Sequence, residues 1–270
     1  MTSAVITLLT DFGLADDFVG VCHGVIARIA PDARVIDVTH GIAPQDVRQG
    51  ATVLANALPY LPPGVHVAVV DPGVGSKRRA VAVRTSDARV LVGPDNGLLT
   101  LAADASGVDA VRELANPRYR LETVSRTFHA RDVFCPAAAH LAAGASFDEL
   151  GPAVDPATLE RLDVPEPDVG HSRLAAHVLA VDRFGNVQLN ARREHLAAIG
   201  AAAGDRVEVR LALDAYFAVV AETFADAPAG ELIVFEDSYG ALSVAINAGN
   251  AAALTGARRG DEIRIAAAAE

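Results

Sequence analysis

A carboxylate and a guanidinium lie on either side of a glycine-rich turn in the segment 71–79. Asp71 directly follows the apolar run 65–70, which predicts a buried strand, and Arg78 comes seven residues later. The intervening Pro-Gly-Val-Gly-Ser-Lys favours a tight turn whose backbone can approach a ligand closely. Ligands of open α/β sheets bind at the carboxyl ends of strands, so this turn is a candidate site. On these residues alone, a salt bridge that caps a surface turn explains the pattern slightly better.

Two more predicted strands end in an aspartate followed by turn residues. The run 4–9 leads to Asp11, and the run 89–92 leads to Asp95. Turn chemistry favours Asp and Gly in any protein, so each aspartate alone is weak evidence for a site. The segment 127–132, which contains His129, adds a titratable side chain, and the four segments together form a pattern characteristic of one family.

The elements that must position these residues alternate between strands and helices. The sequence predicts strands at 4–9, 34–38 and 65–70, helices at 18–30 and 46–58, and an added hairpin at 80–92. Such alternation is typical of βαβ units. We therefore expect an α/β domain with three layers, α/β/α, and a largely parallel sheet.

A segment rich in Pro and Asp, 162–170, predicts a linker, and beyond it the pattern changes. Apart from a helical pattern at 192–199, short strands separated by turns are expected at 177–181, 187–189, 207–213, 216–220, 232–235, 242–246 and 262–266. This pattern predicts a small β-barrel or sandwich. The expected domains are therefore 1–162 and 163–270.

The composition excludes several classes of protein. The chain has 270 residues, of which 51% are hydrophobic and 21% charged, as in an ordinary globular protein. Its formal net charge of -11 argues against a nucleic-acid partner. Without a signal-like or bilayer-length apolar run, we expect a cytoplasmic protein that does not bind membranes. The two cysteines, Cys22 and Cys135, are expected to be buried thiols, and the spacing of histidines and cysteines predicts no metal site. The sequence has no Walker motif and no GxGxxG, and we expect no cofactor.

Seven segments make the chain closely resemble the S-adenosylmethionine hydroxide adenosyltransferases. They are TDFGLADDF at 10–18, VTHGIAPQDVRQGA at 38–51, VVDPGVGSKRR at 69–79, GPDNGLLT at 93–100, FHARDVFCPAAAHLA at 128–142, VDRFGNVQLN at 181–190 and EDSYGALSVAINAGNAA at 236–252. One such motif would be weak evidence, whereas seven in order across both halves are specific.

The resemblance implies an N-terminal α/β domain, a C-terminal β-barrel and a homotrimer with ligand sites at the subunit interfaces. It implies hydrolysis of S-adenosyl-L-methionine to adenosine and L-methionine. Members of the family are described as preferring the epimer with R configuration at sulfur, which would make the role the clearance of a damaged cofactor.

The resemblance also carries site residues. The hydrolytic branch is marked by an Asp-Arg-His set, which falls on Asp71, Arg78 and His129, whereas the related halogenases have an uncharged aromatic residue and a Tyr at the first and last of these positions. The implied substrate-binding residues include Asp71 and Phe128, and Asp11 is implied to bind the ribose. Asp182, Phe184 and Asn186 are implied to contact the methionine moiety and nearby groups, and Ser238 its carboxylate. The residues implied to surround adenine are Phe224, Asn247 and Ala248.

The implied reaction needs an activated nucleophile more than it needs an acid. A neutral thioether leaves the ribose 5′ carbon from a sulfonium, so the leaving group requires no proton, but water is a weak nucleophile. Arg78 would stabilise hydroxide character. His129 could accept the proton or orient the water. Asp71 could orient either of them, and the sequence leaves this division of roles open.

Two other functions remain open at this point. The first is a halide adenosyltransferase, which is disfavoured because the carboxylate of Asp71 would repel a bound halide. The second is a non-catalytic protein that binds adenosine or S-adenosylmethionine, which would bind the ligand tightly without turnover.

Overall fold

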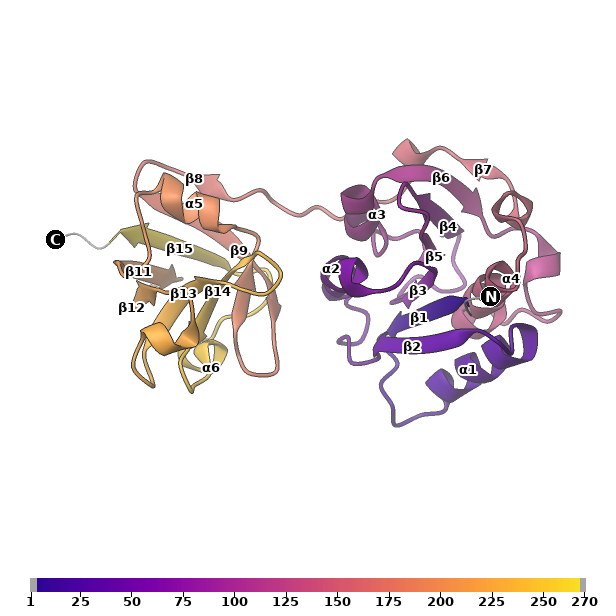
Figure 1. The fold of residues 1–270 in the computed structure, drawn as a ribbon, viewed down its shortest axis with the longest axis horizontal. Coiled ribbons are helices and arrows are strands. Elements are labelled where there is room, and N and C mark those ends of the chain that lie inside the picture. The colour runs from indigo at the N-terminus through magenta and orange to yellow at the C-terminus, as the bar shows by residue number, and fades with distance from the viewer. Residues whose placement is uncertain (1–3, 268–270) are drawn as a thin grey trace. The chain divides into compact units, whose positions relative to one another are not determined.

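The computed structural model describes residues 4–267, which form an N-terminal unit ending at Leu162 and a C-terminal unit beginning at Asp163 (Figure 1). In the first unit, a seven-stranded sheet has the order β2 (Arg34–Thr39), β1 (Val5–Thr10), β3 (Val65–Val69), β5 (Val90–Pro94), β4 (Ala80–Thr85), β6 (Val108–Glu113) and β7 (Ala153–Val154). The first four of these strands are parallel, and the remaining pairs are antiparallel.

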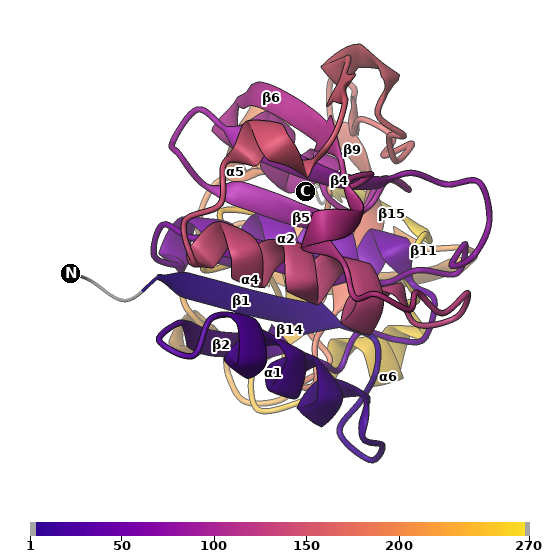
Figure 2. The same cartoon turned by 90° about the vertical axis from the view of Figure 1, so that its right-hand side faces the viewer.

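Four α-helices cover the two faces of this sheet. They are α1 (Phe18–Ile29), α2 (Val47–Ala57), α3 (Thr100–Ser106) and α4 (Cys135–Ala142). Alternate strand residues face opposite layers. Leu8 and Val67 pack in the cluster that contains α1 and α4, while Leu9 and Ala68 pack in the cluster of α2 and α3. Figure 2 shows α1 and α4 on the same side of β1. The three-layer α/β/α architecture predicted from the sequence is therefore confirmed.

The hairpin of β4 and β5 is not simply appended to the edge of the sheet. β5 pairs with β3 in parallel, so it belongs to the parallel core, and β4 lies beyond it. As a consequence, β1, β3 and β5 are neighbours, and the aspartates that follow them, Asp11, Asp71 and Asp95, emerge at the same edge of the sheet.

The C-terminal unit is a barrel, as the resemblance implied. Its strands follow the closed order β9 (Arg173–Val181), β10 (Val187–Leu189), β14 (Leu242–Ile246), β13 (Leu232–Glu236), β12 (Asp214–Val220), β11 (Arg206–Leu211) and β15 (Glu262–Ala267), and β8 (Asp168–Val169) pairs with β9 from outside. The ring closes because β10 pairs with both β9 and β14.

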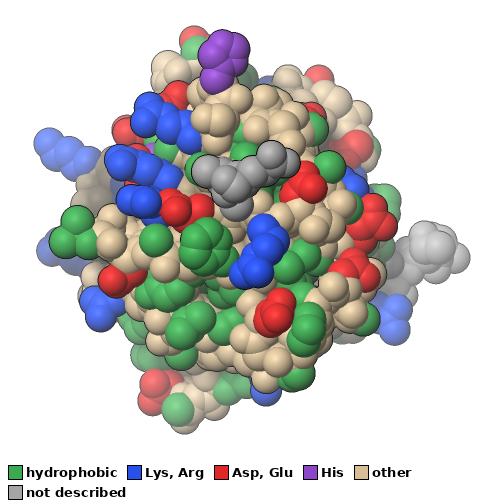
Figure 3. All heavy atoms as spheres, turned by 90° about the vertical axis from the view of Figure 1, so that its left-hand side faces the viewer, with side chains coloured by type: hydrophobic (Ala, Val, Ile, Leu, Met, Phe, Trp, Pro, Cys, Tyr) green, Lys and Arg blue, Asp and Glu red, His purple; other side chains and the backbone are tan. Residues whose placement is uncertain are grey.

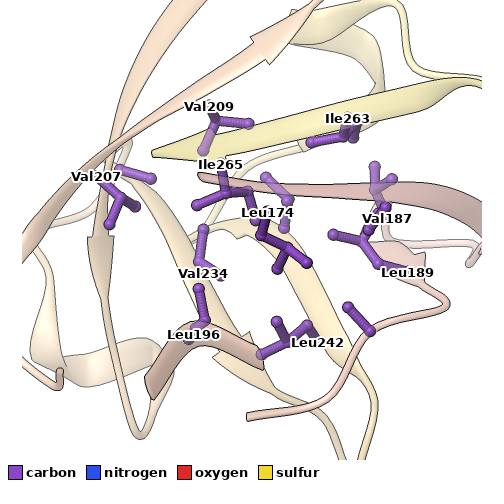
Figure 4. Close-up of a cluster of buried hydrophobic side chains, with 14 of the residues drawn as sticks. Leu174, Val187, Leu189, Leu196, Val207, Val209, Val234, Leu242, Ile263 and Ile265 are labelled. Carbon is purple, nitrogen blue, oxygen red and sulfur yellow. The ribbon is translucent and has the colours of Figure 1, made fainter. Parts of the chain in front are cut away.

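The barrel core is built from buried aliphatic side chains. All seven strands contribute to it, and α5 (Arg193–Ala198) adds Leu196 (Figure 4). A short helix that the sequence did not predict, α6 (Ala251–Thr255), follows β14. It begins where the side chain of Asn250 accepts a hydrogen bond from the Ala253 N–H. A helix of this length has too little periodicity to be found from the sequence.

The described residues also form several short 3-10 helices and one π-helix. The 3-10 segments are Leu58–Tyr60, Pro117–Tyr119, Phe147–Leu150, Pro156–Thr158 and Phe224–Asp226, and the π-helix is Ala130–Phe134. Both cysteines are buried free thiols, as predicted. Within residues 4–267, no helix is long and apolar enough to cross a bilayer. On the face shown in Figure 3, acidic and basic side chains are interspersed with hydrophobic ones rather than gathered by sign.

Candidate active site

Asp71, Arg78 and His129 form one hydrogen-bonded set in the N-terminal unit. Arg78 donates from Nε to Asp71 Oδ1 at 2.9 Å and from Nη2 to Asp71 Oδ2, so the pair is bidentate. Nη2 of Arg78 also lies 2.9 Å from His129 Nδ1. The side chains of Asp71 and Arg78 are only 6% and 9% exposed, so solvent screens this ion pair much less than it screens a surface pair. The structure thus brings together three residues that lie far apart in the sequence, at positions 71, 78 and 129.

The glycine-rich turn positions the first two members of this set. The N–H of Val74 donates to the carbonyl of Asp71, and the N–H of Arg78 donates to the hydroxyl of Ser76. Gly75 has φ +78°, and a Cβ at this position would lie 2.3 Å from the carbonyl oxygen of Arg126. Only glycine therefore lets the turn approach the segment that leads to His129.

His129 is neutral in this arrangement. An arginine can only donate, so Nδ1 of His129 accepts from Arg78, and in the neutral ring the proton is on Nε2. Burial, together with the positive charge of Arg78, holds the pKa of His129 below its usual value. His129 also directly precedes the π-helix Ala130–Phe134, a type of helix that occurs frequently at functional sites.

Asp11, at the end of β1, is held by a neighbouring loop. Its Oδ2 accepts a hydrogen bond from the N–H of Gln45 at 2.8 Å, and Gln45 adopts the left-handed conformation with φ +65°. Among the bonds of the described residues, Oδ1 of Asp11 accepts none. The carboxylate is therefore fixed in orientation while one oxygen remains available for a ligand.

Phe128 belongs to an aromatic group rather than standing alone. Its ring centroid lies 5.8 Å from that of Phe12 and 5.2 Å from that of Phe18, both in edge-on geometry. The guanidinium of Arg131 lies 5.1 Å from the centroid of Phe128 and is ion-paired with the fully buried Asp132. These contacts join the first loop of the sheet to the segment that carries His129.

The Asp95 turn braces the site. Asp95 is buried and accepts bonds from Arg79 Nε at 2.8 Å and from the N–H of Glu160 at 2.9 Å. Asn96 donates from Nδ2 to the carbonyl of Val70 at 2.9 Å, directly before Asp71. The backbone that delivers Asp71 is therefore fixed from the neighbouring strand end. Asn96 was not among the predicted site residues, although its motif was part of the family pattern.

In the C-terminal unit, Asp182 shapes the loop between β9 and β10. Its Oδ1 accepts from the N–H groups of Phe184 and Asn186 at 2.8 and 2.9 Å, and its Oδ2 accepts from Asn186 Nδ2 at 2.8 Å. Phe184 is 67% exposed at the tip of this loop. The carboxylate of Asp182 is thus occupied within its own loop, which presents Phe184.

Asn247 and Ala248 lie between this loop and the 3-10 segment that contains Phe224. Nδ2 of Asn247 donates to the carbonyl of Ala227 at 2.7 Å, directly after that segment. Gly185, in the Asp182 loop, lies against the side chain of Asn250. Ala248 has φ +56°, in the left-handed region. The predicted residues of the loop, of this segment and of positions 247–248 therefore gather at one end of the barrel.

Ser238 is not part of that group. It follows β13, in the turn that leads into β14, whereas Asn247 follows the opposite end of β14. Five residues of strand separate the two ends, about 16 Å at the usual rise of a strand. Within this unit, the predicted carboxylate-binding serine and the predicted adenine-binding residues lie at opposite ends of one strand.

One group of described residues has the composition of a metal site. His23, Asp37 and His40 each offer one ligand atom, and these atoms all lie within 4.8 Å of one another. The sequence predicted no metal site because no histidine pair has a ligand spacing. Asp37 and His40 are neighbours at the end of β2, but His23 comes from α1, so no local pattern could have joined all three.

Both units match known families. The model of the SAM hydroxide adenosyltransferase N-terminal domain matches residues 6–151, and the model of the C-terminal domain of the same family matches residues 176–264.

Whole-chain relatives agree with these matches. The chain is 53% identical to the (R)-S-adenosyl-L-methionine hydrolase of Salinispora arenicola over 97% of both chains. It is 29% identical to the fluorinase of an Actinoplanes species, over 90% of this chain and 91% of that enzyme. The crystal structure of an uncharacterized conserved protein from Thermotoga maritima matches with a TM-score of 0.92 and 39% identity, over 97% of this chain and 99% of that one.

Proposed function

This chain belongs to the SAM hydroxide adenosyltransferase family, and we propose that it hydrolyses S-adenosyl-L-methionine, in the form with R configuration at sulfur, to adenosine and L-methionine. The observation that carries the proposal is the buried, bidentate Asp71–Arg78 pair bonded to a neutral His129. The hydrolase relative is also far more similar to this chain than the fluorinase is.

In the proposed reaction, the oxygen of water attacks the 5′ carbon of the ribose as the bond from that carbon to sulfur breaks. The bonding pair goes to sulfur, which leaves as the neutral thioether of methionine. A proton passes from the attacking oxygen to a base as the new carbon–oxygen bond forms, so the oxygen has hydroxide character during the attack and the product carries a neutral 5′ hydroxyl.

The hydrogen bonds favour a division of roles within the set. His129 already accepts from Arg78 through Nδ1 and carries its proton on Nε2, so it is better arranged to donate to the water and orient it. Asp71 is a carboxylate with lone pairs beyond its two bonds to Arg78, and we assign proton acceptance to it. Arg78 fixes the orientation of both partners and stabilises negative charge that develops on the attacking oxygen.

The other predicted residues would hold the substrate. We assign the unbonded oxygen of Asp11 to the ribose hydroxyls. We assign Phe224, Asn247 and Ala248 to adenine, and Phe184 and Asn186 at the same end of the barrel to the methionine moiety and the groups next to it. The rings of Phe184 and Phe224 are exposed, and an exposed aromatic ring can stack on a base. For Ser238 we propose the methionine carboxylate, and for Asp182 the support of the loop that carries Phe184 and Asn186.

A halide adenosyltransferase remains disfavoured on physical grounds. A halide would have to bind beside the 6%-exposed carboxylate of Asp71, where the repulsion between two negative charges is poorly screened. Water is neutral until it reacts, so the same carboxylate does not oppose its binding.

We further propose that the active enzyme is a homotrimer with ligand sites at its subunit interfaces, and that it acts in the cytoplasm. The division of the family's ligand residues between two compact units supports the first proposal. The two buried free thiols support the second, since disulfides are rare in that compartment.

Product analysis with each sulfonium epimer tests the proposed function. The purified chain is incubated with the R and S epimers separately, and nucleosides are separated by liquid chromatography. Adenosine and methionine should form in equal amounts, and faster from the R epimer. Tight adenosine binding without product from either epimer would instead identify a non-catalytic binding protein, and chloride- or fluoride-dependent formation of a 5′-halo nucleoside would identify a halogenase.

A further inference from the structure

Three side chains from separate elements converge in the N-terminal unit at a place outside the Asp71 set. His23 comes from α1, Asp37 from β2, and His40 from the segment directly after β2. Asp37 Oδ1 lies 2.9 Å from Nε2 of His23 and 3.1 Å from Nε2 of His40. One nitrogen of each imidazole therefore lies next to the same carboxylate oxygen of Asp37.

The Nε2 atom of His40 lacks a well-formed interaction in this cluster. The side chain of His40 is 4% exposed, and its Nε2 is buried 3.1 Å from Asp37 Oδ1 but makes no well-formed hydrogen bond among the described residues. A buried polar atom without a bond is unfavourable, because burial has removed its hydrogen bonds to water. A cation between His40 and Asp37 would supply the missing interaction.

The other nitrogen of His40 is held as in many metal-binding histidines. Nδ1 lies 2.8 Å from the hydroxyl of Thr10, which fixes the ring and directs Nε2 toward Asp37. A hydrogen-bond partner on the second ring nitrogen is a regular feature of histidine metal ligands, because it sets the tautomer and the ring orientation.

Asp37 Oδ1 lies at nearly the separations of a coordination shell from the two ring nitrogens, and the ligand atoms of the two histidines lie within 4.8 Å of each other. Ligand atoms about 2.1 Å from a tetrahedral ion are about 3.4 Å apart, so the 2.9 and 3.1 Å separations need to widen by only a few tenths of an ångström. The side chains of His23 and Asp37 are 37% and 40% exposed. They can make this adjustment, and the solvent side leaves room for water ligands.

A plain cluster of hydrogen bonds is the competing explanation. Asp37 accepts a well-formed bond from His23, which is enough to join α1 to β2 without an ion. That explanation accounts for His23 but leaves Nε2 of His40 buried and unbonded. The metal site accounts for all three side chains.

We propose that His23, Asp37 and His40 bind one divalent transition-metal ion, with zinc as the best match and water completing the coordination. Imidazole ligands favour zinc and its neighbours over magnesium and calcium, which prefer oxygen. The ion is structural, since it ties α1 and β2 to the end of β1, where the N–H of Gly13 donates to the carbonyl of His40 at 2.8 Å. The inference does not depend on the proposed hydrolase reaction.

Calorimetric titration of the full chain with zinc, after removal of metals by a chelator, tests the site. The wild type should bind one zinc ion per chain, and His23→Ala should weaken this binding at least about tenfold. His171→Ala is the matched control, because His171 is an exposed histidine of the C-terminal unit. Circular dichroism establishes that each variant is folded, and His23 is suited to replacement because its side chain is partly exposed.

Three further measurements test the same site. Asp37→Asn should weaken zinc binding as well, and cobalt added in place of zinc should give visible absorption bands that His23→Ala loses. Magnesium should give no binding heat. A wild type that binds no zinc, or variants at His23 and Asp37 that bind it as the wild type does, would overturn the proposal.

Discussion

At the scale of single residues, the central feature is an arginine with two partners. Arg78 bonds both oxygens of Asp71 and one nitrogen of His129, so each member of the set fixes the other two. The sequence motifs were sufficient to propose these three residues. The tautomer of His129 could not be predicted from sequence, because it is set by which atom of Arg78 reaches the ring in three dimensions.

Replacing Arg78 by Ala should lower turnover by about 10²–10³-fold, since one donor to a developing negative charge is lost. Binding of the product adenosine, measured by calorimetry, should change little, because the lost interaction acts on the nucleophile. Arg84→Ala is a suitable control, since it removes another Arg–Asp pair, with Asp109, at an exposed position of the same sheet. Near-normal turnover in Arg78→Ala would exclude the proposed role.

The pH dependence of turnover should report the protonation of His129. Protonation would convert Nδ1 into a donor and destroy the bond from Arg78, so the active form is the neutral ring. Because burial and Arg78 lower the pKa of His129, turnover should be retained as pH falls and be lost only below about 6.5, the usual value for histidine.

His129→Ala should therefore have lower turnover, and its pH profile should lack the acidic limb, which is the loss of turnover as His129 becomes protonated. His140→Ala should keep it, although burial also lowers the pKa of His140, because that residue lies elsewhere, against Tyr119. An unchanged acidic limb in His129→Ala would assign the titration to another group. Circular dichroism across the same pH range separates loss of turnover from unfolding.

At the scale of elements, the carboxyl ends of β1, β3 and β5 position the site. Strand periodicity and turn residues were enough to predict the strands and the aspartates after them. The pairing of β5 with β3 was not predictable, because the pairing of strands distant in sequence depends on the whole sheet. The π-helix that directly follows His129 was missed for a similar reason, since its wider turn has no signature in local sequence.

Gly75→Ala tests the positioning of the turn. A Cβ at position 75 would meet the carbonyl of Arg126 at 2.3 Å, so the turn must move away from the His129 segment, and turnover should fall at least about tenfold. Gly200→Ala is a matched control, because Gly200 has φ +79° against +78° for Gly75, but a Cβ at position 200 would meet no atom within 4 Å. Both variants carry the left-handed backbone cost of about 1 kcal/mol, but only the first carries the collision. Equal turnover in the two would mean that the close approach at Gly75 does not position the site.

At the scale of the whole molecule, the residues proposed to bind the ligand are divided between two units. The fold class and the barrel followed from strand patterns together with the family resemblance. The convergence of His23, Asp37 and His40 did not, because it joins a helix, a strand and a loop through tertiary packing.

Assembly should be required for activity. Light scattering should give a mass of about three times that of the 27.9 kDa chain. On dilution, turnover should be lost at the protein concentration at which the trimer dissociates. Recovery of turnover on concentrating the same sample provides the control for irreversible loss. A monomer with full activity would contradict the proposed sites at subunit interfaces.

The central claim is that water attacks the ribose 5′ carbon while sulfur leaves. The most direct test is the reaction in oxygen-18 water, followed by mass spectrometry of both products. We expect one oxygen-18 atom in adenosine, at the 5′ hydroxyl, and unlabelled methionine. Unlabelled adenosine, release of free adenine, or formation of methylthioadenosine would each show that another bond is broken and would contradict the mechanism.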